Sequence, residues 1–557
     1  MTKAGRRELQ AILNKQIRKR HHRSQKSNIT KEMLKVTMWS LLNFFLFFIR
    51  SVVDKIVNFA LEWYWGEKKS CPPLRKNFFI TKSAVEIAEL IRQKDISSYH
   101  VVNAYINRII ETNPLLNAVL DGPFIEALDE AQAIDERISK ESISEEEFLK
   151  KPFLGVPFTT KDSTAVSGKL HTLGIAARKN YRAKEDAECV RLMKKAGAII
   201  IATSSIPEIN RWQETRNNLI GQTNNPYDIR RTVGGSSGGE GALISSCGSC
   251  FGLGTDIGGS IRMPAYYCGI FGHKPTTGMV NTRGCTLRTG TEKNSMVVAG
   301  MMTRYAMDLK PIFEVLVGPK NSNILKLNEN ADVKKLRYFY CLDSGDMRCS
   351  GLCPNTRDTI NKVVSHFHNL TGTDVQKVKL KGVEYTSKLW RYWMTQEPAE
   401  FCYLLGNSKK LNPLVELIKK LTGQSEYTMA SIFSLIDGIL PKEKAEKMKA
   451  ITEELSQEIE ELLGDDGVLI YPSYTYPAPY HYAPLVQIYN FGYWAIMNVL
   501  HLPATQIPMG LNSEGLPMGI QIVTTKNRDR HCFAVAEELD RQFGGWKAPF
   551  NILGDIN

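Results

Sequence analysis

The feature that most constrains this chain is a pair of glycine- and serine-rich stretches that lie close together in the sequence. Residues 232–240 read TVGGSSGGE, and residues 254–262 read GTDIGGSIR. Because glycine has no Cβ atom and tolerates positive φ angles, such stretches form tight loops whose backbone N–H groups are open to a ligand. Loops of this kind build oxyanion holes or hold phosphates, so we expect the rest of the fold to position them.

A third stretch places a lysine where it can act as a base. Residues 154–162 read LGVPFTTKD, which predicts a short apolar strand that ends on Lys161, with an acidic residue beside it. A lysine is a base only when it is neutral, and burial lowers its pKa from the ordinary value of about 10.4. We therefore expect Lys161, Ser236 and Ser260 to carry the chemistry.

These three stretches together resemble the amidase signature family. The resemblance also includes residues 269–276 (GIFGHKPT) and 515–523 (GLPMGIQIV), and it runs from about residue 83 to about residue 543. Within the family, the two glycine-rich stretches look most like those of the membrane-anchored fatty-acid amide hydrolases, with the type-2 branch as the nearest match.

The resemblance implies a role for each residue of the site. Neutral Lys161 draws a proton through Ser236 from Ser260, which attacks an amide carbonyl and becomes acylated; the same relay returns the proton to the amine. A cis peptide bond is implied before Ser236. The backbone N–H groups expected to form the oxyanion hole belong to Ile257, Gly258, Gly259 and Ser260, and glycine at 258 and 259 is expected to keep space for the substrate.

Other residues of the two stretches are expected to support the site. Ser237 is expected to supply a hydrogen bond, while Asp256 and Arg262 brace the loop. The substrates implied by the resemblance are fatty-acid amides such as N-acylethanolamines or primary fatty amides. We expect no metal and no cofactor, because His366, His368 and the Cys247/Cys250 pair lack the further ligands that a metal site needs.

The fold implied is α/β, a single domain with a large central mixed twisted sheet covered by helices, preceded by an N-terminal membrane-anchor helix. The chain itself supports this fold class. Residues 197–203 and 467–472 are apolar runs that each follow a helix-like stretch, which predicts buried strands. Ser83 and Glu86 form a capping-box pattern, which predicts that a helix begins there.

The positive charge of the chain is concentrated at its N-terminus. The net charge is +13, and residues 1–35 contain eleven lysines and arginines against two glutamates. This basic tail runs directly into residues 36–49, an apolar run of 14 residues. That order favours an anionic membrane surface over nucleic acid as the partner of the tail.

The apolar run is shorter than the roughly 20 residues that cross a bilayer. Extended to residue 65 it becomes a longer helix with an amphipathic second half, whose aromatic residues Trp39, Trp63, Tyr64 and Trp65 suit a membrane interface. The expected division is therefore residues 1–35 as a basic tail, 36–65 as a membrane-anchor or interfacial helix, and 66–557 as the catalytic domain. Whether residues 36–65 span the membrane or lie in its interface stays open.

The expected location is an intracellular membrane, such as the endoplasmic reticulum or a lipid droplet. Residues 399–440 include apolar Leu417, Ile418 and Leu421 beside two lysines, which is interpreted either as plain helix packing or as a second membrane-facing element near the substrate entrance. The expected partners are the membrane and a lipid-like amide, with no nucleic acid; a homodimer is left open.

Several rival interpretations remain. The pattern Gly-x-Ser-x-Gly around Ser236 also fits a nucleophile elbow, which needs a histidine base such as His481, His501 or His531. No Lys-Ser or Lys-Thr pair closes the glycine loop, which argues against a P-loop. A short-chain amidase, an amidotransferase subunit and a catalytically silent lipid-binding protein are the remaining alternatives. The eleven irregularly spaced cysteines do not suggest a disulfide framework.

Overall fold

A computed structural model describes residues 45, 48–140, 143–292, 295–398 and 401–553. The chain divides into two units, Met1–Ile56 and Val57–Asn557. Residues 48–56 of the smaller unit are helical, and residues 57–65 of the larger unit are helical as well. The larger unit contains the sheet and all three residues expected to carry the chemistry.

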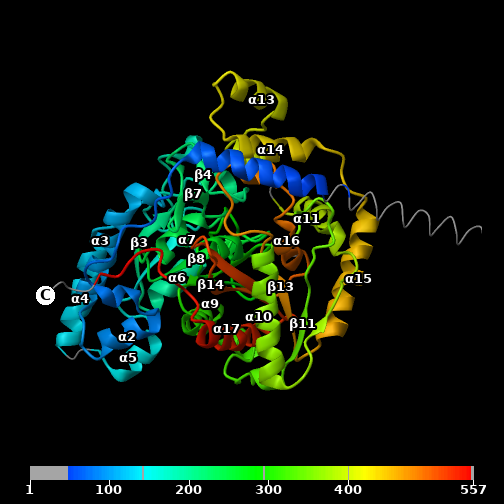
Figure 1. Cartoon of the computed structure of the whole chain (residues 1–557). Helices are drawn as coiled ribbons and strands as arrows, with labels where there is room; N and C mark the ends of the chain where they lie inside the picture. Colours follow the sequence, from blue (N-terminus) through cyan, green and yellow to red (C-terminus); the bar gives the residue numbers. More distant parts are fainter. Residues whose placement is uncertain (1–44, 46–47, 141–142, 293–294, 399–400, 554–557) are drawn as a thin grey trace, which may run out of the picture. The chain divides into compact units, whose positions relative to one another are not determined.

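Within the described part of the larger unit, eleven strands form one mixed sheet (Figure 1). In spatial order these strands are β1 (Val119–Asp121), β3 (Ile199–Ser204), β2 (Pro157–Lys161), β8 (Phe251–Asp256), β10 (Val298–Thr303), β9 (Phe271–Lys274), β14 (Ala504–Leu511), β15 (Pro517–Val523), β13 (Gly467–Pro472), β11 (Arg337–Tyr340) and β12 (Gln376–Lys377). Two short hairpins accompany it: β4 (Arg216–Asn217) with β5 (Gly221–Gln222), and β6 (Asn224–Asn225) with β7 (Asp228–Thr232).

Helices surround the sheet (Figure 1). They are α2 (Ala84–Arg92), α3 (Ser98–Leu116), α4 (Glu126–Ser139), α5 (Glu145–Lys150), α6 (Glu188–Lys195), α7 (Gly238–Ser245), α8 (Arg262–Tyr267), α9 (Leu309–Ile324), α10 (Pro354–Thr371), α11 (Thr386–Met394), α12 (Phe401–Leu405), α13 (Pro413–Leu421), α14 (Met429–Ile439), α15 (Ala445–Leu463), α16 (Gly492–Val499) and α17 (Asp529–Phe543). Helix α7 packs on β2, β8 and β10, while α8 and α17 pack on β14 and β15. Because every residue of β2, β3, β8 and β10 is buried, this part of the sheet is covered on both faces. The α/β class is confirmed.

The central strands bring the candidate residues to one edge. Strand β2 runs parallel to β8, with Phe158 opposite Phe251 and Thr160 opposite Leu253. Since parallel strands end at the same edge of a sheet, Lys161 at the end of β2 and Asp256 at the end of β8 emerge side by side. The loop that follows β8 and carries Ser260 therefore begins beside Lys161, whereas Ser236 follows β7 of the separate hairpin.

The local predictions agree with the structure at several places. Ser83 accepts a hydrogen bond from the Glu86 amide at 3.1 Å, and the Glu86 carboxylate accepts one from the Ser83 amide at 2.9 Å, so the capping box opens α2. The apolar runs at 197–203 and 467–472 form the buried strands β3 and β13.

The N-terminal predictions are described only in part. Residues 1–35 and most of the apolar run lie outside the described residues. In the larger unit, Phe59, Trp63 and Tyr64 are exposed, whereas Trp65 stacks on Tyr482 with ring centroids 5.8 Å apart. No helix among the described residues is long and apolar enough to span a bilayer. The division at residues 35 and 65 stays a prediction.

Candidate active site

Lys161 is held inside the protein by two hydroxyl groups. Its side chain is fully buried, and Nζ donates to Ser236 Oγ at 2.8 Å and to Thr255 Oγ1 at 3.0 Å. Burial lowers the pKa of Lys161 to about 7, against the opposing effect of Asp256 and other nearby acidic groups. A substantial fraction of this amine is therefore neutral near neutral pH, as a base requires.

Ser236 lies on the loop between β7 and α7. The peptide bond between Gly235 and Ser236 is cis, as the family resemblance implies. The next residue along, Ser237, donates its backbone N–H to the Ser260 carbonyl at 3.1 Å. The loop of Ser236 therefore lies directly against the loop of Ser260.

The three candidate residues differ in their access to solvent. Lys161 and Ser236 are completely buried, whereas Ser260 keeps 8% of its surface exposed. A nucleophile has to reach an incoming substrate, while a base and a proton bridge do not. The exposure pattern thus agrees with the order in which the relay is expected to run.

Asp256 braces the loop that carries Ser260. Its carboxylate accepts hydrogen bonds from the Gly259 amide at 2.7 Å and the Ile261 amide at 3.0 Å, and it pairs with Arg262 at 3.1 Å. Burial raises the pKa of Asp256, but Arg262 and these N–H groups outweigh that effect and hold the pKa well below its usual range. The guanidinium also donates to Gln521 at 2.6 Å and to Asn498 at 2.7 Å.

Two expectations about this loop stay predictions, and hydrogen bonds of the loop bear on both. The Gly259 amide donates to Asp256 at 2.7 Å, so the N–H groups of Ile257, Gly258 and Ser260 are the stronger candidates for the oxyanion hole. The Ser237 hydroxyl has no hydrogen-bond partner among the described residues, so Ser237 supports the site through its backbone.

The structure gives a further reason for glycine at two positions of this loop. A Cβ atom at Gly258 would lie 2.9 Å from Trp390 Nε1, and one at Gly259 would lie 2.5 Å from Trp494 Cβ. Gly259 further has a φ of 116°. These glycines therefore leave room for two tryptophans of the protein itself.

The nucleophile-elbow alternative loses one of its three candidate bases. Both ring nitrogens of His481 are engaged elsewhere, Nδ1 with Glu214 Oε1 and Nε2 with the Ile229 carbonyl, each at 3.0 Å. The Ser236 hydroxyl is instead contacted by Lys161. Among the described residues, the hydrogen-bond partner of Ser236 Oγ is therefore a lysine and not a histidine.

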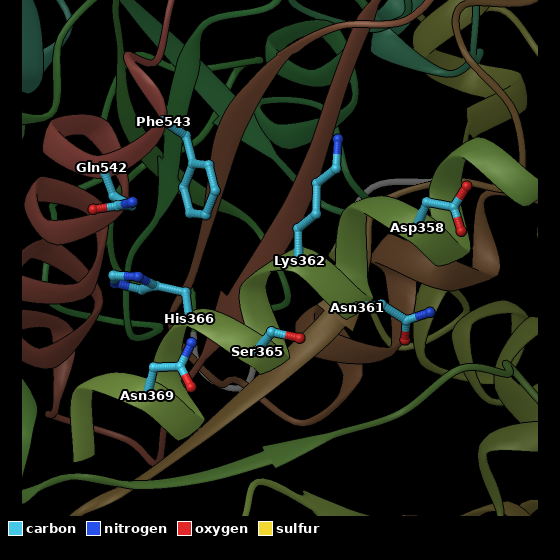
Figure 2. A pocket seen from close by; sticks show the side chains of 8 residues that line it. All are labelled: Asp358, Asn361, Lys362, Ser365, His366, Asn369, Gln542 and Phe543. Carbon is cyan, nitrogen blue, oxygen red and sulfur yellow. The ribbon is translucent and has the colours of Figure 1, made fainter. Parts of the chain in front are cut away.

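A polar surface groove of about 510 Å³ lies between α10 and α17 (Figure 2). Its side chains are Asp358, Asn361, Lys362, Ser365, His366, Asn369, Gln542 and Phe543. His366 pairs with Glu538 at 2.9 Å, and the groove shares no residue with the Lys161 site. The candidate active site is therefore identified by the contacts of Lys161 and Ser236 and not by the size of this groove.

Cys247 and Cys250 are buried free thiols.

Some contacts of the site could not be read from the sequence. Thr255 lies within the second glycine-rich stretch, next to Asp256, and this position is the sequence feature that could have indicated its contact with Lys161. Asn498 and Gln521 reach Arg262 from segments more than 230 residues away. No local pattern marks them.

With this geometry described, known proteins can be compared. The family model described as Amidase matches residues 100–533. This chain belongs to the amidase signature family. An amidase relative, fatty-acid amide hydrolase 2 of Homo sapiens, is 42% identical over 480 residues, which cover 84% of this chain and 90% of that protein. Fatty-acid amide hydrolase 2-B of Danio rerio is 39% identical over 492 residues, covering 86% of this chain and 93% of that protein.

A solved structure shares the amidase fold. The structure named fatty acid amide hydrolase superposes with a TM-score of 0.68 at 21% identity, covering 85% of this chain and 87% of that one. At that identity the match shows the fold alone. Family membership and the two relatives establish that this chain is an amidase.

Proposed function

We propose that this amidase is a serine hydrolase that cleaves fatty-acid amides, with Ser260 as nucleophile, Ser236 as proton bridge and Lys161 as base. The contact that carries the proposal is the 2.8 Å hydrogen bond from the buried Lys161 amine to the Ser236 hydroxyl. An amide carbonyl is a poor electrophile, so hydrolysis needs an activated nucleophile, a stabilised oxyanion and a proton for the amine.

The relay supplies these requirements in order. Neutral Lys161 accepts the Ser236 proton while Ser236 accepts the Ser260 proton, and the Ser260 oxygen bonds to the carbonyl carbon. The resulting oxyanion is stabilised by backbone N–H groups of the 257–260 loop. When it collapses, the C–N bond breaks, the relay returns the proton to the leaving nitrogen, and the acyl group stays on Ser260. Water then attacks this ester by the same route and releases the acid.

The substrate class is inferred from the named relatives and from the surface. Both relatives are called fatty-acid amide hydrolases. Helix α13 exposes Leu414, Ile418 and Leu421, which recur at helical spacing and so share one face, whereas Leu417 is half-buried. Lys419 lies beside this face. We propose that this face contacts a membrane from which the lipid substrate enters.

The N-terminal segment belongs to the same proposal. Residues 36–65 would hold the enzyme on an intracellular membrane, and the exposed Phe59, Trp63 and Tyr64 of the larger unit support an interfacial role. Each acyl methylene buried by the protein contributes about 0.8 kcal/mol, which would favour long-chain amides such as N-acylethanolamines or primary fatty amides. A homodimer stays a prediction.

The test of the substrate class is a chain-length series of acyl amides. We expect kcat/KM to rise from short to long chains on vesicles, and to fall for the long chains alone in Leu421→Ser. Leu149→Ser is the matched control, since Leu149 of α5 is 72% exposed and Leu421 is 75% exposed. If short amides react best, or if Leu421→Ser lowers kcat/KM equally for all chains, a general amidase is the better account.

A further inference from the structure

Trp390 contacts the loop of Ser260 from a distant part of the chain. It lies on α11, and its indole N–H donates to the Ile257 carbonyl at 2.8 Å. The ring also fills the space over Gly258, where a Cβ atom would lie 2.9 Å from Nε1. An edge contact with Phe491, with centroids 4.9 Å apart, fixes the ring on another side.

Along the loop, consecutive peptides are hydrogen-bonded alternately through a carbonyl and through an N–H group. Trp390 holds the carbonyl of Ile257, Asp256 accepts the amide of Gly259 at 2.7 Å, and the carbonyl of Gly259 accepts the Met263 amide at 2.7 Å. The peptides after Ile257 and Gly259 are trans. Because the C=O and N–H groups of a trans peptide point in opposite directions, the Gly258 N–H points away from Trp390 and the Ser260 N–H points away from the Met263 amide.

Among the described residues, neither of these two N–H groups has a recorded acceptor, in contrast with that of Gly259. They belong to alternate peptides, one of which ends on the proposed nucleophile itself. A developing oxyanion needs backbone donors that the protein leaves without an acceptor, each 2.7 to 3.1 Å from the oxygen.

We propose that Trp390 is a positioning residue for amide hydrolysis, whose indole N–H orients the Ile257–Gly258 peptide so that the Gly258 N–H faces the oxyanion. The inference rests on the proposed role of Ser260 as nucleophile. Trp390 does not touch the reacting atoms. It acts through the peptide that it holds, so loss of the indole N–H lets this peptide rotate.

Helix α11 is itself anchored, so the indole is presented from a fixed support. The next residue, Arg391, donates to the Asp437 carbonyl of α14 at 3.0 Å and to the Pro441 carbonyl at 2.9 Å. Its guanidinium also pairs with the Asp437 carboxylate at 3.2 Å. Trp390 and Arg391 of α11 thus contact two different parts of the protein, the loop of residues 257–260 and helix α14.

Two substitutions separate the hydrogen bond from the packing of the ring. Trp390→Phe keeps an aromatic ring but has no N–H donor. Trp390→His loses the benzene ring, yet its Nε2 overlays the indole nitrogen when the five-membered rings are superposed, so the neutral imidazole can still donate. The matched control is Trp393→Phe on the same helix, which removes an indole N–H that donates to Thr452 Oγ1 at 3.0 Å, away from the loop.

For Trp390→Phe we expect kcat/KM for a long-chain amide to fall about 10- to 100-fold, less than the loss of an oxyanion donor itself. KM should change little. The affinity for an acyl boronate, which forms a tetrahedral adduct on a serine, should fall by the same factor as kcat/KM, while the affinity for the product fatty acid stays within about twofold. Above pH 7, Trp390→His should keep most of the rate, and Trp393→Phe should resemble the parent. Melting temperatures report whether each variant is folded.

The proposal is overturned if Trp390→Phe is as active as Trp393→Phe, or if Trp390→His is the more damaged variant, since packing would then explain the contact. It is equally overturned if kcat/KM falls while boronate affinity is retained. Failure of the proposed function looks different: turnover would then survive Ser260→Ala, whatever the Trp390 variants do.

Discussion

Two strand ends of the sheet each carry a buried lysine, and only one of them is built like a base. Burial lowers the pKa of Lys161 at the end of β2 and of Lys274 at the end of β9, each to about 7. The Lys161 amine donates to two hydroxyls, whereas Lys274 donates to the carbonyl of its neighbour Pro275 at 2.9 Å. A lowered pKa therefore does not identify a base on its own. The contact with the Ser236 hydroxyl, which the proposed relay requires, is what distinguishes Lys161 from Lys274.

The largest effect should come from removing the end of the Lys161 relay. Ser260→Ala leaves both lysines in place but removes the nucleophile, so we expect turnover to fall on the order of 10⁵-fold or more. Intact mass measurements with substrate should show no acyl adduct on this variant. Ser237→Ala is the control, because that hydroxyl has no partner in the described structure. Retention of turnover in Ser260→Ala would exclude Ser260 as the nucleophile.

The next test separates the two lysines directly. Lys161→Met should lower amide kcat/KM by about 10³-fold and ester kcat/KM less, because an alcohol leaves with less help from protonation. Lys274→Met should lower both to a similar and smaller extent. Parallel kinetics on an amide and its matched ester measure this. Equal amide and ester losses in Lys161→Met would make that lysine a structural residue, like Lys274.

The pH dependence should follow Lys161 alone. Only the neutral amine is a base, so kcat/KM should rise with pH through the Lys161 pKa of about 7 and then level off. The Lys274→Met variant should keep this rise at the same pH. If the rise moves in Lys274→Met and remains unchanged in Lys161→Met, the roles of the two lysines are reversed.

The smallest effect should come from Thr255→Val. The Thr255 hydroxyl accepts a hydrogen bond from Lys161, which stabilises the charged amine and raises its pKa. Without this acceptor the Lys161 pKa falls further, so the rise in kcat/KM should move to lower pH by less than about one unit. A move to higher pH would contradict the assigned contact.

The parts of the site that sequence predicted are those with local signals. The glycine and serine stretches point to the loops, and the apolar run ending on Lys161 predicts β2. The structure places Lys161 and the loop of Ser260 at one sheet edge because β2 and β8 are parallel neighbours, and the Lys161 amine meets Ser236 of the loop after β7 there. Ser83 likewise starts a helix through contacts within three residues.

The parts that sequence missed depend on contacts between distant segments. Trp390 meets Ile257 across 133 residues, and Asn498 meets Arg262 across 236. The hydrogen bond of the Gly259 amide could not be predicted from the sequence for a related reason. The glycine-rich stretch predicts that the Gly259 N–H group is accessible to a ligand, but the position of the Asp256 carboxylate decides where that group points.

The close approach of Gly258 to Trp390 limits which substitutions these two positions can accept during the evolution of this amidase. A side chain at 258 needs the space that the indole occupies, since its Cβ atom would come within 2.9 Å of the ring nitrogen. Substitutions at the two positions are therefore expected to depend on each other, although the positions are far apart in the sequence. In a library that randomises both codons, we expect selection for activity to recover alanine or serine at 258 only together with a smaller residue at 390, which deep sequencing of the survivors would reveal.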